Sequence, residues 1–263
     1  MNSLSSSPIP QGSCTLVGAG PGDPELLTIK AAKAIAGASV LFVDDLVSDA
    51  ILAHANPNAR VVYVGKRGGC KSTPQAFIEK LMVAAVHEGE NVVRLKGGDP
   101  FIFGRGGEEV EHLREAGIAV QVINGITSGL AGLTSLGAPL THRDRAHGVL
   151  FMTGHAKPGD SGPDWRLIAA TAHAARLTLV IYMGVSGVQR IRDELLTGLP
   201  GNTPVAIIQH ASLPYQRHAL TFLQDLPECI AENQLGSPSI IVVGDVVQGI
   251  AAWQAEQGQR RVA

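Results

Sequence analysis

The residues from Gly97 to Gly107 combine several glycines, which give the backbone conformational freedom, with charged side chains that can take part in binding or catalysis. The block reads Gly-Gly-Asp-Pro-Phe-Ile-Phe-Gly-Arg-Gly-Gly and directly follows the apolar run 91–96, which is typical of a buried strand. Because glycine has no Cβ, backbone N–H and C=O groups in such a loop can approach a ligand closely. Loops of this kind lie at the carboxyl ends of strands in open α/β sheets, where sites form. The block therefore predicts a ligand cradle.

A second glycine motif, at residues 18–23, imitates a dinucleotide-binding fingerprint. It lies between a strand-like run and a helical pattern, and Asp44 follows at the distance of the fingerprint's acidic residue. However, the third glycine of the fingerprint would fall on Asp23, and Pro21 has no N–H to offer a pyrophosphate. Asp23 and Pro24 instead predict the N-cap and first position of a helix. The motif therefore argues against an NAD(P) site.

Two stretches, 50–78 and 137–159, are rich in cations and poor in acids. Their basic side chains are Arg60, Lys66, Arg67 and Lys71 in the first stretch, and Arg143, Arg145 and Lys157 with His142, His147 and His155 in the second. In a chain whose net charge is only −2, such islands suit a ligand that carries several carboxylates. Two solvated basic faces are the alternative interpretation.

The histidines and cysteines of the chain have no metal-binding spacing. The sequence contains no H-E-x-x-H pair and no Cys/His cluster, and Cys14, Cys70 and Cys229 form no C-x-x-C motif. Free thiols fit a reducing compartment. We therefore expect chemistry that needs no metal.

Short β-prone runs alternate with helical patterns, which predicts an α/β protein with mostly parallel sheets covered by helices. In the first half, the expected strands are 14–17, 40–43, 61–64, 92–95 and 120–123, and the expected helices are 26–35, 74–86 and 108–116. In the second half, the expected strands are 149–152, 179–182, 205–208 and 240–243, and residues 216–222 are expected to pair antiparallel with a neighbour.

A stretch rich in Gly, Ser and Thr after residue 123 separates the two series of strands. We expect a disordered tail at 1–12, an N-terminal α/β domain at 13–140, a C-terminal α/β domain at 141–250 and a second tail at 251–263. The length of 263 residues and the hydrophobic content of 45% allow two such cores. A cleft between two domains is a common place for a small-molecule site.

Composition limits the possible partners. The net charge of −2 gives no general attraction to nucleic acid or to anionic membranes. The first 12 residues lack the pattern of a secretory signal, and no window reaches the ~18 apolar residues that cross a bilayer. We expect a cytoplasmic protein with a small-molecule partner and with neither nucleic acid nor membrane as partner.

Several segments resemble, in the same order, those of the tetrapyrrole methyltransferase family. They are 17–28, 64–67, 93–109, 125–128, 139–143, 153–155 and 182–184. The resemblance implies the class III methyltransferase fold, in which two α/β/α domains hold S-adenosylmethionine in the cleft between them, and a homodimer. The implied reaction is two methyl transfers to uroporphyrinogen III, on carbons 2 and 7. They give precorrin-1 and then precorrin-2 for sirohaem, cobalamin or haem d1, and release S-adenosylhomocysteine.

The resemblance also implies roles for individual residues. Asp44 and Lys66 take the acid/base positions of the family, and Arg105 and Glu108 fall on its substrate-side loop as further catalytic residues. The implied cofactor-binding residues are Pro21, Gly97, Gly98, Asp99, Ile102, Thr127, Ser128, Met183 and Ala211. The implied substrate-binding residues are Arg105, Glu108, His155, Met183, Arg67 and Arg143.

Other interpretations of these residues stay open. Arg105 and Glu108 suit a carboxylate clamp, but they also suit an ordinary pair at a helix N-terminus. The chain departs from the family pattern at Asp45, Asn124 and His210. These departures leave room for another precorrin methyltransferase, or for a non-catalytic module that binds S-adenosylmethionine or a nucleotide.

Overall fold

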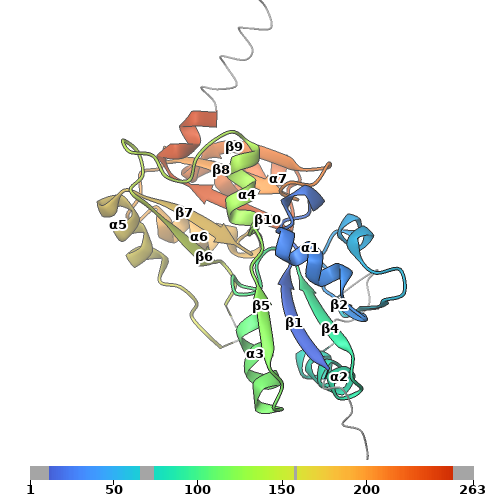
Figure 1. The fold of residues 1–263 in the computed structure, drawn as a ribbon. Coiled ribbons are helices and arrows are strands. Elements are labelled where there is room, and N and C mark those ends of the chain that lie inside the picture. Colours follow the sequence, from blue (N-terminus) through green and yellow to red (C-terminus); the bar gives the residue numbers. More distant parts are fainter. Residues whose placement is uncertain (1–11, 66–73, 157–158, 251–263) are drawn as a thin grey trace, which may run out of the picture. The chain divides into compact units, whose positions relative to one another are not determined.

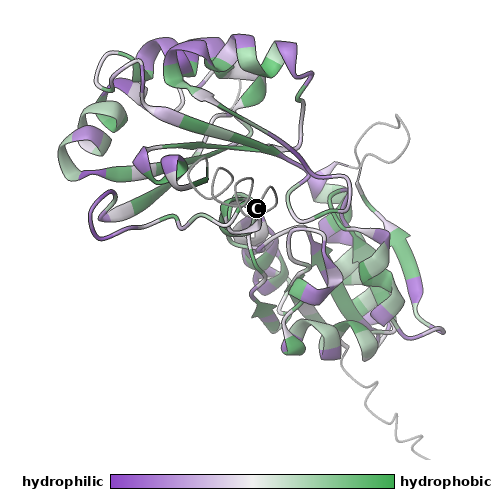
Figure 2. Ribbon diagram, turned by 90° about the horizontal axis from the view of Figure 1, so that it is seen from above, coloured by the Kyte–Doolittle hydropathy of each residue, from purple (hydrophilic) through white to green (hydrophobic). Residues whose placement is uncertain are grey.

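The computed structural model describes residues 12–65, 74–156 and 159–250. The chain divides into two compact units, of which the first ends at Thr127 and the second begins at Ser128 (Figure 1). Each unit is built around its own five-stranded sheet. Figure 2 shows that the strands are mostly hydrophobic, whereas the helices carry both hydrophobic and hydrophilic residues. This distribution is expected of helices that cover the faces of a buried sheet.

The sheet of the first unit is wholly parallel. Its strands lie in the order β3 (Arg60–Tyr63), β2 (Val40–Val43), β4 (Asn91–Lys96), β1 (Ser13–Gly18) and β5 (Val120–Ile123). Strands β2 and β5 span the residues predicted from the sequence, and β1, β3 and β4 differ from the predicted bounds by one residue at each end. Because parallel strands share a direction, the loops that follow them all emerge at one edge of the sheet.

Helices cover both faces of this first sheet. The bounds are α1 (Ile29–Ala36), α2 (Gln75–His87), α3 (Gly106–Glu115) and the 3₁₀ helices η1 (Pro24–Leu26) and η2 (Asp49–His54). Alternate residues of the strands point to opposite faces. Leu16 and Phe42 pack with α2 and α3, while Leu41 and Val43 pack with α1 and η2.

The predicted helix at 26–35 is split into two elements. Asp23 caps η1 by accepting a hydrogen bond from the Glu25 N–H at 2.9 Å, with Pro24 at the first position, as predicted. However, η1 ends after three residues, and α1 begins anew at Ile29. Thr28 is the N-cap of α1, because its hydroxyl oxygen accepts from the Ala31 N–H at 3.1 Å.

The sheet of the second unit is mixed. Its strands lie in the order β6 (Gly148–Thr153), β7 (Leu177–Tyr182), β10 (Ser239–Val243), β8 (Pro204–Gln209) and β9 (Arg217–Phe222). Only β6 and β7 pair in parallel, because β10 inserts in the opposite direction between β7 and β8. The antiparallel partner predicted for 216–222 is confirmed as β8. Strands β6, β7 and β8 still run in the same direction.

Helices also cover both faces of the second sheet. The bounds are α4 (Ser128–Ser135), α5 (Trp165–Ala175), α6 (Val188–Leu195), α7 (Leu226–Glu232) and the 3₁₀ helices η4 (Val185–Gly187), η5 (Leu223–Asp225) and η6 (Asp245–Val247). Trp165, Ile191 and Leu226 of α5, α6 and α7 pack together on one face. Leu133 of α4 belongs to the core on the other face.

Helix α4 lies within the Gly/Ser/Thr stretch that the sequence analysis placed before the domain boundary. Its glycines allow it to pack closely on the second sheet, since a Cβ on Gly129 would overlap the Tyr182 hydroxyl. That hydroxyl oxygen accepts a hydrogen bond from the Gly129 N–H at 2.9 Å. The segment therefore groups with the second unit, and the division at Thr127 lies earlier than the boundary we placed at residue 140.

The expected tails at 1–12 and 251–263 lie outside the described residues, apart from Gly12. Within the described part of the chain, every helix is too short or too polar to span a membrane.

Candidate functional site

Glycines bring three loops into backbone contact at the carboxyl edge of the first sheet. The Gly98 N–H donates to the Gly20 carbonyl at 2.7 Å, and the Gly20 N–H donates back to the Gly98 carbonyl at 3.2 Å. A Cβ on Gly18 would lie 2.7 Å from the Gly98 oxygen, and a Cβ on Gly125 would overlap the same oxygen. The loops after β1, β4 and β5 therefore meet where only glycine fits.

The Asp99 side chain links the loop after β4 to the loop after β5. Its side chain is buried, and Oδ2 accepts hydrogen bonds from the Asn124 amide and the Gly125 N–H, both at 3.1 Å. The other oxygen, Oδ1, accepts from the Phe101 N–H at 2.8 Å. Asn124, which departs from the family's usual proline, is thus one of the donors that fix the loop after β5.

The loop after β4 also presents apolar side chains outward. Phe101, Ile102 and Phe103 are 53%, 36% and 40% exposed. Phe103 and Arg105 adopt left-handed backbone conformations, with φ of 54° and 57°. Strain of this kind at residues other than glycine concentrates at binding and catalytic sites. The left-handed backbone of Phe103 and Arg105 therefore indicates that this loop holds these two side chains in particular positions for a functional reason.

Arg105 and Glu108 form an exposed ion pair at the start of α3. Arg105 is the N-cap residue, and its Nε donates to Glu108 Oε2 at 3.0 Å. This hydrogen bond raises the pKa of the Arg105 guanidinium above its ordinary value, so the side chain is always charged. Both side chains are about half exposed. Both interpretations of the pair, as a carboxylate clamp and as a helix-terminal pair, are compatible with this geometry.

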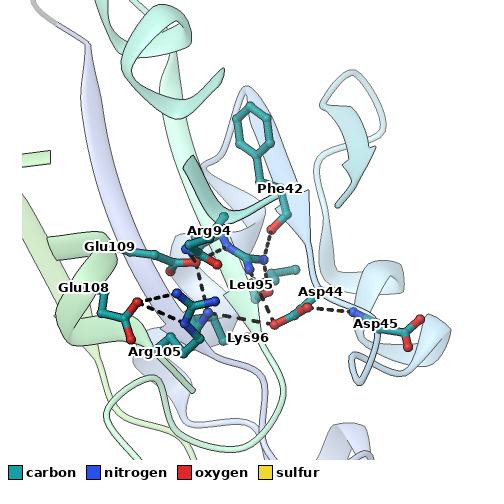
Figure 3. Close-up of polar contacts among 10 residues, drawn as sticks. Phe42, Asp44, Asp45, Arg94, Leu95, Lys96, Arg105, Glu108 and Glu109 are labelled. Atoms are coloured by element: carbon teal, nitrogen blue, oxygen red, sulfur yellow. Dashed lines mark hydrogen bonds and ion pairs between the residues drawn. The ribbon is translucent and has the colours of Figure 1, made fainter. Parts of the chain in front are cut away.

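Asp44 follows β2 at the same edge and faces two cations of β4 (Figure 3). Its Oδ2 lies 3.4 Å from an Arg94 Nη and 3.8 Å from Lys96 Nζ. Behind them, Glu109 of α3 accepts from Arg94 Nε and Lys96 Nζ, each at 3.1 Å from its Oε1. We call Asp44, Arg94, Lys96 and Glu109 the charge network.

Burial shifts the pKa values of groups in and near the charge network. Burial lowers the pKa of Lys96, as does the neighbouring Arg94, whereas Glu109 and Asp44 act in the opposite direction. Burial, together with the negative charge of Glu109, raises the pKa of the nearby Cys14 thiol to about 12. Cys14 is therefore a neutral thiol at physiological pH and is no nucleophile.

Arg94, Lys96 and Glu109 were not predicted as site residues, because both cations lie in an apolar run and Glu109 lies in a predicted helix. The available signal was their spacing. Residues two apart in a strand share a face, so two cations at this spacing need a common counter-ion.

In the second unit, three predicted site residues follow strands that run in the same direction. His155 follows β6, Met183 follows β7 and Ala211 follows β8, so these three lie at one edge of their sheet. Met183 is 45% exposed and has a left-handed backbone, with φ of 54°. Ala211 is buried, next to His210, whose ring packs edge-on against Tyr215 at 4.9 Å between centroids.

Arg143 is not placed with these three residues. Its segment is anchored at the amino ends of β6 and β7, where the Leu140 carbonyl accepts from the Thr178 hydroxyl at 2.8 Å. On its other side, the His147 N–H donates to the Arg176 carbonyl at 2.8 Å. Within the second unit, the Arg143 segment is therefore held at the edge opposite that of His155.

The remaining predicted residues are less informative. Pro21 is half-buried after β1, Thr127 is buried, and Ser128 begins α4. Lys66 and Arg67 lie outside the described residues.

Among the described residues, no three His, Cys, Asp or Glu side chains are grouped as metal ligands would be.

Comparison with known proteins decides the family. The model of the tetrapyrrole (corrin/porphyrin) methylases matches residues 13–227, which is most of the chain. The chain belongs to the tetrapyrrole methylase family. Uroporphyrinogen-III C-methyltransferase of Pseudomonas aeruginosa is 49% identical over 242 residues, covering 92% of this chain and 96% of that protein.

Solved structures of tetrapyrrole methylases have the same fold. A uroporphyrin-III C-methyltransferase of Thermus thermophilus, complexed with S-adenyl homocysteine, has a TM-score of 0.76 and 40% identity over 90% of this chain and 93% of that one. Siroheme synthase 1 of Aeromonas hydrophila is 48% identical over 238 residues, and the match covers 90% of this chain. This chain spans about half the length of that synthase.

Alanine at Gly125 should disrupt the site of this tetrapyrrole methylase. The new Cβ would overlap the Gly98 carbonyl, so the loops after β4 and β5 must separate. We expect the free energy of unfolding to fall by about 1–3 kcal/mol, and affinity for S-adenosylhomocysteine, measured by calorimetry, to fall at least tenfold.

Gly107→Ala is the matched control for Gly125→Ala. Gly107 lies in the first turn of α3, and a Cβ there would meet no atom within 4 Å. This variant should bind as the wild type does and be unchanged or stabilised by up to about 1 kcal/mol. Equal binding by the two variants would contradict the role given to the loop contact.

Proposed function

We propose that this chain is an S-adenosylmethionine-dependent C-methyltransferase that methylates uroporphyrinogen III twice. The products are precorrin-1 and then precorrin-2, methylated on carbons 2 and 7, for sirohaem, cobalamin or haem d1. The observation that carries the proposal is the 49% identity to a uroporphyrinogen-III C-methyltransferase over nearly the full length of both chains. We further propose that the enzyme acts as a homodimer.

The carboxyl edge of the first sheet fits the methyl donor. The three loops that meet at Gly18, Gly98 and Gly125 are held together there by close backbone contacts, and Ile102 in the loop after β4 offers an exposed apolar side chain. The residues proposed to hold the donor are Pro21, Gly97, Gly98, Asp99, Ile102, Thr127, Ser128, Met183 and Ala211. Of these, Asp99 contributes through the shape of the loop, because both of its oxygens accept hydrogen bonds from the protein.

The donor, when bound, supplies an activated methyl group on a positively charged sulfur. The task of the protein is then to orient an electron-rich pyrrole carbon and to exclude water. The exposed Arg105 guanidinium suits a substrate that carries eight carboxylates, because a guanidinium can form paired hydrogen bonds with a carboxylate. Glu108 holds that guanidinium in place. We assign further substrate contacts to His155, Met183 and Arg67, but not to Arg143, whose segment is held at the opposite edge of its sheet.

Each methyl addition leaves a positive charge on the ring, and the ring must then lose a proton. Asp44 is the candidate acceptor, because its carboxylate is fixed at the site edge and is about one third exposed. The resemblance also gives Lys66 an acid/base role beside Asp44. This role stays a prediction, because Lys66 lies outside the described part of the chain.

An assay with S-adenosylmethionine and freshly reduced uroporphyrinogen III tests the proposal. After oxidation, the product should absorb and fluoresce as a dimethylated isobacteriochlorin. Activity only on a later precorrin would show that the chain is another precorrin methyltransferase. Tight binding of S-adenosylmethionine without turnover on any acceptor would indicate a non-catalytic module. Either result would overturn the proposal, and calorimetry with NAD provides the negative control.

A further inference from the structure

Three members of the charge network have no role in the proposed reaction. Arg94, Lys96 and Glu109 are 2%, 3% and 0% exposed, so none of them is a surface group that water could satisfy. Buried charges are costly unless they are paired and hydrogen-bonded. Apolar residues of similar size would fill the same space with no such cost. Their presence so close to the site therefore calls for an explanation.

The two cations of the network are linked to both of its carboxylates. Glu109 Oε1 accepts from Arg94, from Lys96 and from the Gln75 amide, the last at 2.9 Å. Its other oxygen, Oε2, is buried and has no hydrogen-bond partner among the described residues. Glu109 therefore serves as the counter-ion of the cations, and it belongs to the same helical turn as the substrate-side Glu108.

Asp44 is held through both of its oxygens. Oδ1 accepts from the Asp45 N–H at 3.0 Å, and Oδ2 faces Lys96 and Arg94. Figure 3 shows Lys96 between Asp44 and Glu109, with its ammonium group directed at both. With all four groups ionised, the network has two positive and two negative charges and is neutral. Removing Lys96 leaves Arg94 alone to balance two carboxylates.

Within the described part of the chain, Arg94 has a further anchor outside the network and Lys96 has none. The Arg94 guanidinium also donates to the carbonyls of Phe42 and Leu95, at 3.3 and 3.0 Å. Among the described residues, the polar contacts of the Lys96 ammonium group are to Glu109 and Asp44. Its side chain is also confined, because it is buried. Lys96 is therefore specialised for linking the two carboxylates.

We propose that Lys96 is a positioning residue whose ammonium group, anchored on Glu109, fixes the Asp44 carboxylate at the edge of the site. The proposal rests on the proposed function, in which Asp44 takes the proton from the methylated ring. Lys96 itself does not touch the substrate. It connects helix α3, which carries Arg105 and Glu108, to the end of β2, which carries Asp44.

A double-mutant cycle tests this role. Lys96→Met is made in the wild type and in Asp44→Asn, and methyl transfer is followed under saturating and limiting S-adenosylmethionine. In the wild-type background, we expect kcat to fall about 10²-fold with KM for the donor unchanged. In the Asp44→Asn background, Lys96→Met should lower kcat by less than about threefold, because Lys96 acts through Asp44. An equal loss in both backgrounds, or a loss in KM alone, would overturn the proposal.

A charge-balanced variant separates positioning from folding. Lys96→Met with Glu109→Gln removes one charge of each sign, so it leaves one cation and one carboxylate in the network. If Lys96→Met alone does not fold, the double-mutant cycle uses this pair of changes in place of Lys96→Met. The outcomes stated for the cycle then support or overturn the proposal in the same way.

Crystal structures of the folded variant and the wild type provide a readout that does not require activity. We expect Asp44 to leave its observed position in the variant. An Asp44 carboxylate that stays in place would refute the proposal. An inactive wild type whose Asp44 moves on loss of Lys96 would instead count against the proposed function alone.

Discussion

Arg105→Ala should lose most of the methyl transfer activity while its affinity for the donor stays within about twofold of the wild type. Arg105 is the exposed cation at the start of α3, held by Glu108, and the proposed substrate is a polyanion. Removing one partner of a close charge pair costs about 2–4 kcal/mol, which corresponds to a 30- to 1,000-fold loss in kcat/KM. Steady-state kinetics and calorimetry with S-adenosylhomocysteine measure the two quantities.

Three control variants make the result on Arg105 specific. Arg105→Gly should lose as much activity as Arg105→Ala, although glycine relieves the left-handed backbone at this position. Arg105→Lys keeps the charge without the guanidinium fork, so we expect an intermediate loss of about tenfold. Arg114→Ala removes an exposed arginine from the last turn of the same helix and should have little effect. An Arg105→Ala enzyme within threefold of the wild type would refute the substrate role.

Glu109→Ala should have the largest effect on stability. Glu109 is fully buried, and the change leaves Arg94 and Lys96 without the carboxylate to which both donate. Breaking a buried pair by removing one partner costs about 3–5 kcal/mol. Urea unfolding measures this loss, provided that the linear slope is the same in the two proteins.

Glu111→Ala is the matched control for Glu109→Ala. Glu111 is an exposed glutamate in the same helix, two residues further on, so its removal should change the free energy of unfolding by less than about 0.5 kcal/mol. If Glu109→Ala cost no more than Glu111→Ala, the four charges would not form a coupled network.

Most of the strands were predictable because they are short runs of β-branched, aromatic and other apolar residues. The order of the second sheet was not predictable in this way. Strand β10 is an apolar run like β7 and β8, and nothing in such a run indicates whether it lies parallel or antiparallel to its neighbours. Helix α4 was missed because its glycines are poor helix formers, and it is held by packing on the second sheet.

Site residues that belong to a local sequence motif could be predicted. Site residues that come together only through tertiary contacts could not. The loop block 97–107 and the acid at Asp44 follow strands, so their place at the sheet edge could be inferred. The charge network depends on contacts between β4 and α3, since Arg94 and Glu109 are 15 residues apart in sequence. Similarly, the contact between Asn124 and Asp99 gives a physical reason for a residue that the sequence analysis noted only as a departure.

Transfer of a labelled methyl group tests the central claim most directly. The enzyme is incubated with S-adenosylmethionine carrying carbon-13 in its methyl group and with freshly reduced uroporphyrinogen III, and the product is examined by mass spectrometry and carbon NMR. We predict two labelled methyl groups on each tetrapyrrole, both bound to ring carbons, and two molecules of S-adenosylhomocysteine. Recovery of unlabelled substrate, from an enzyme shown to bind S-adenosylhomocysteine, would contradict the account.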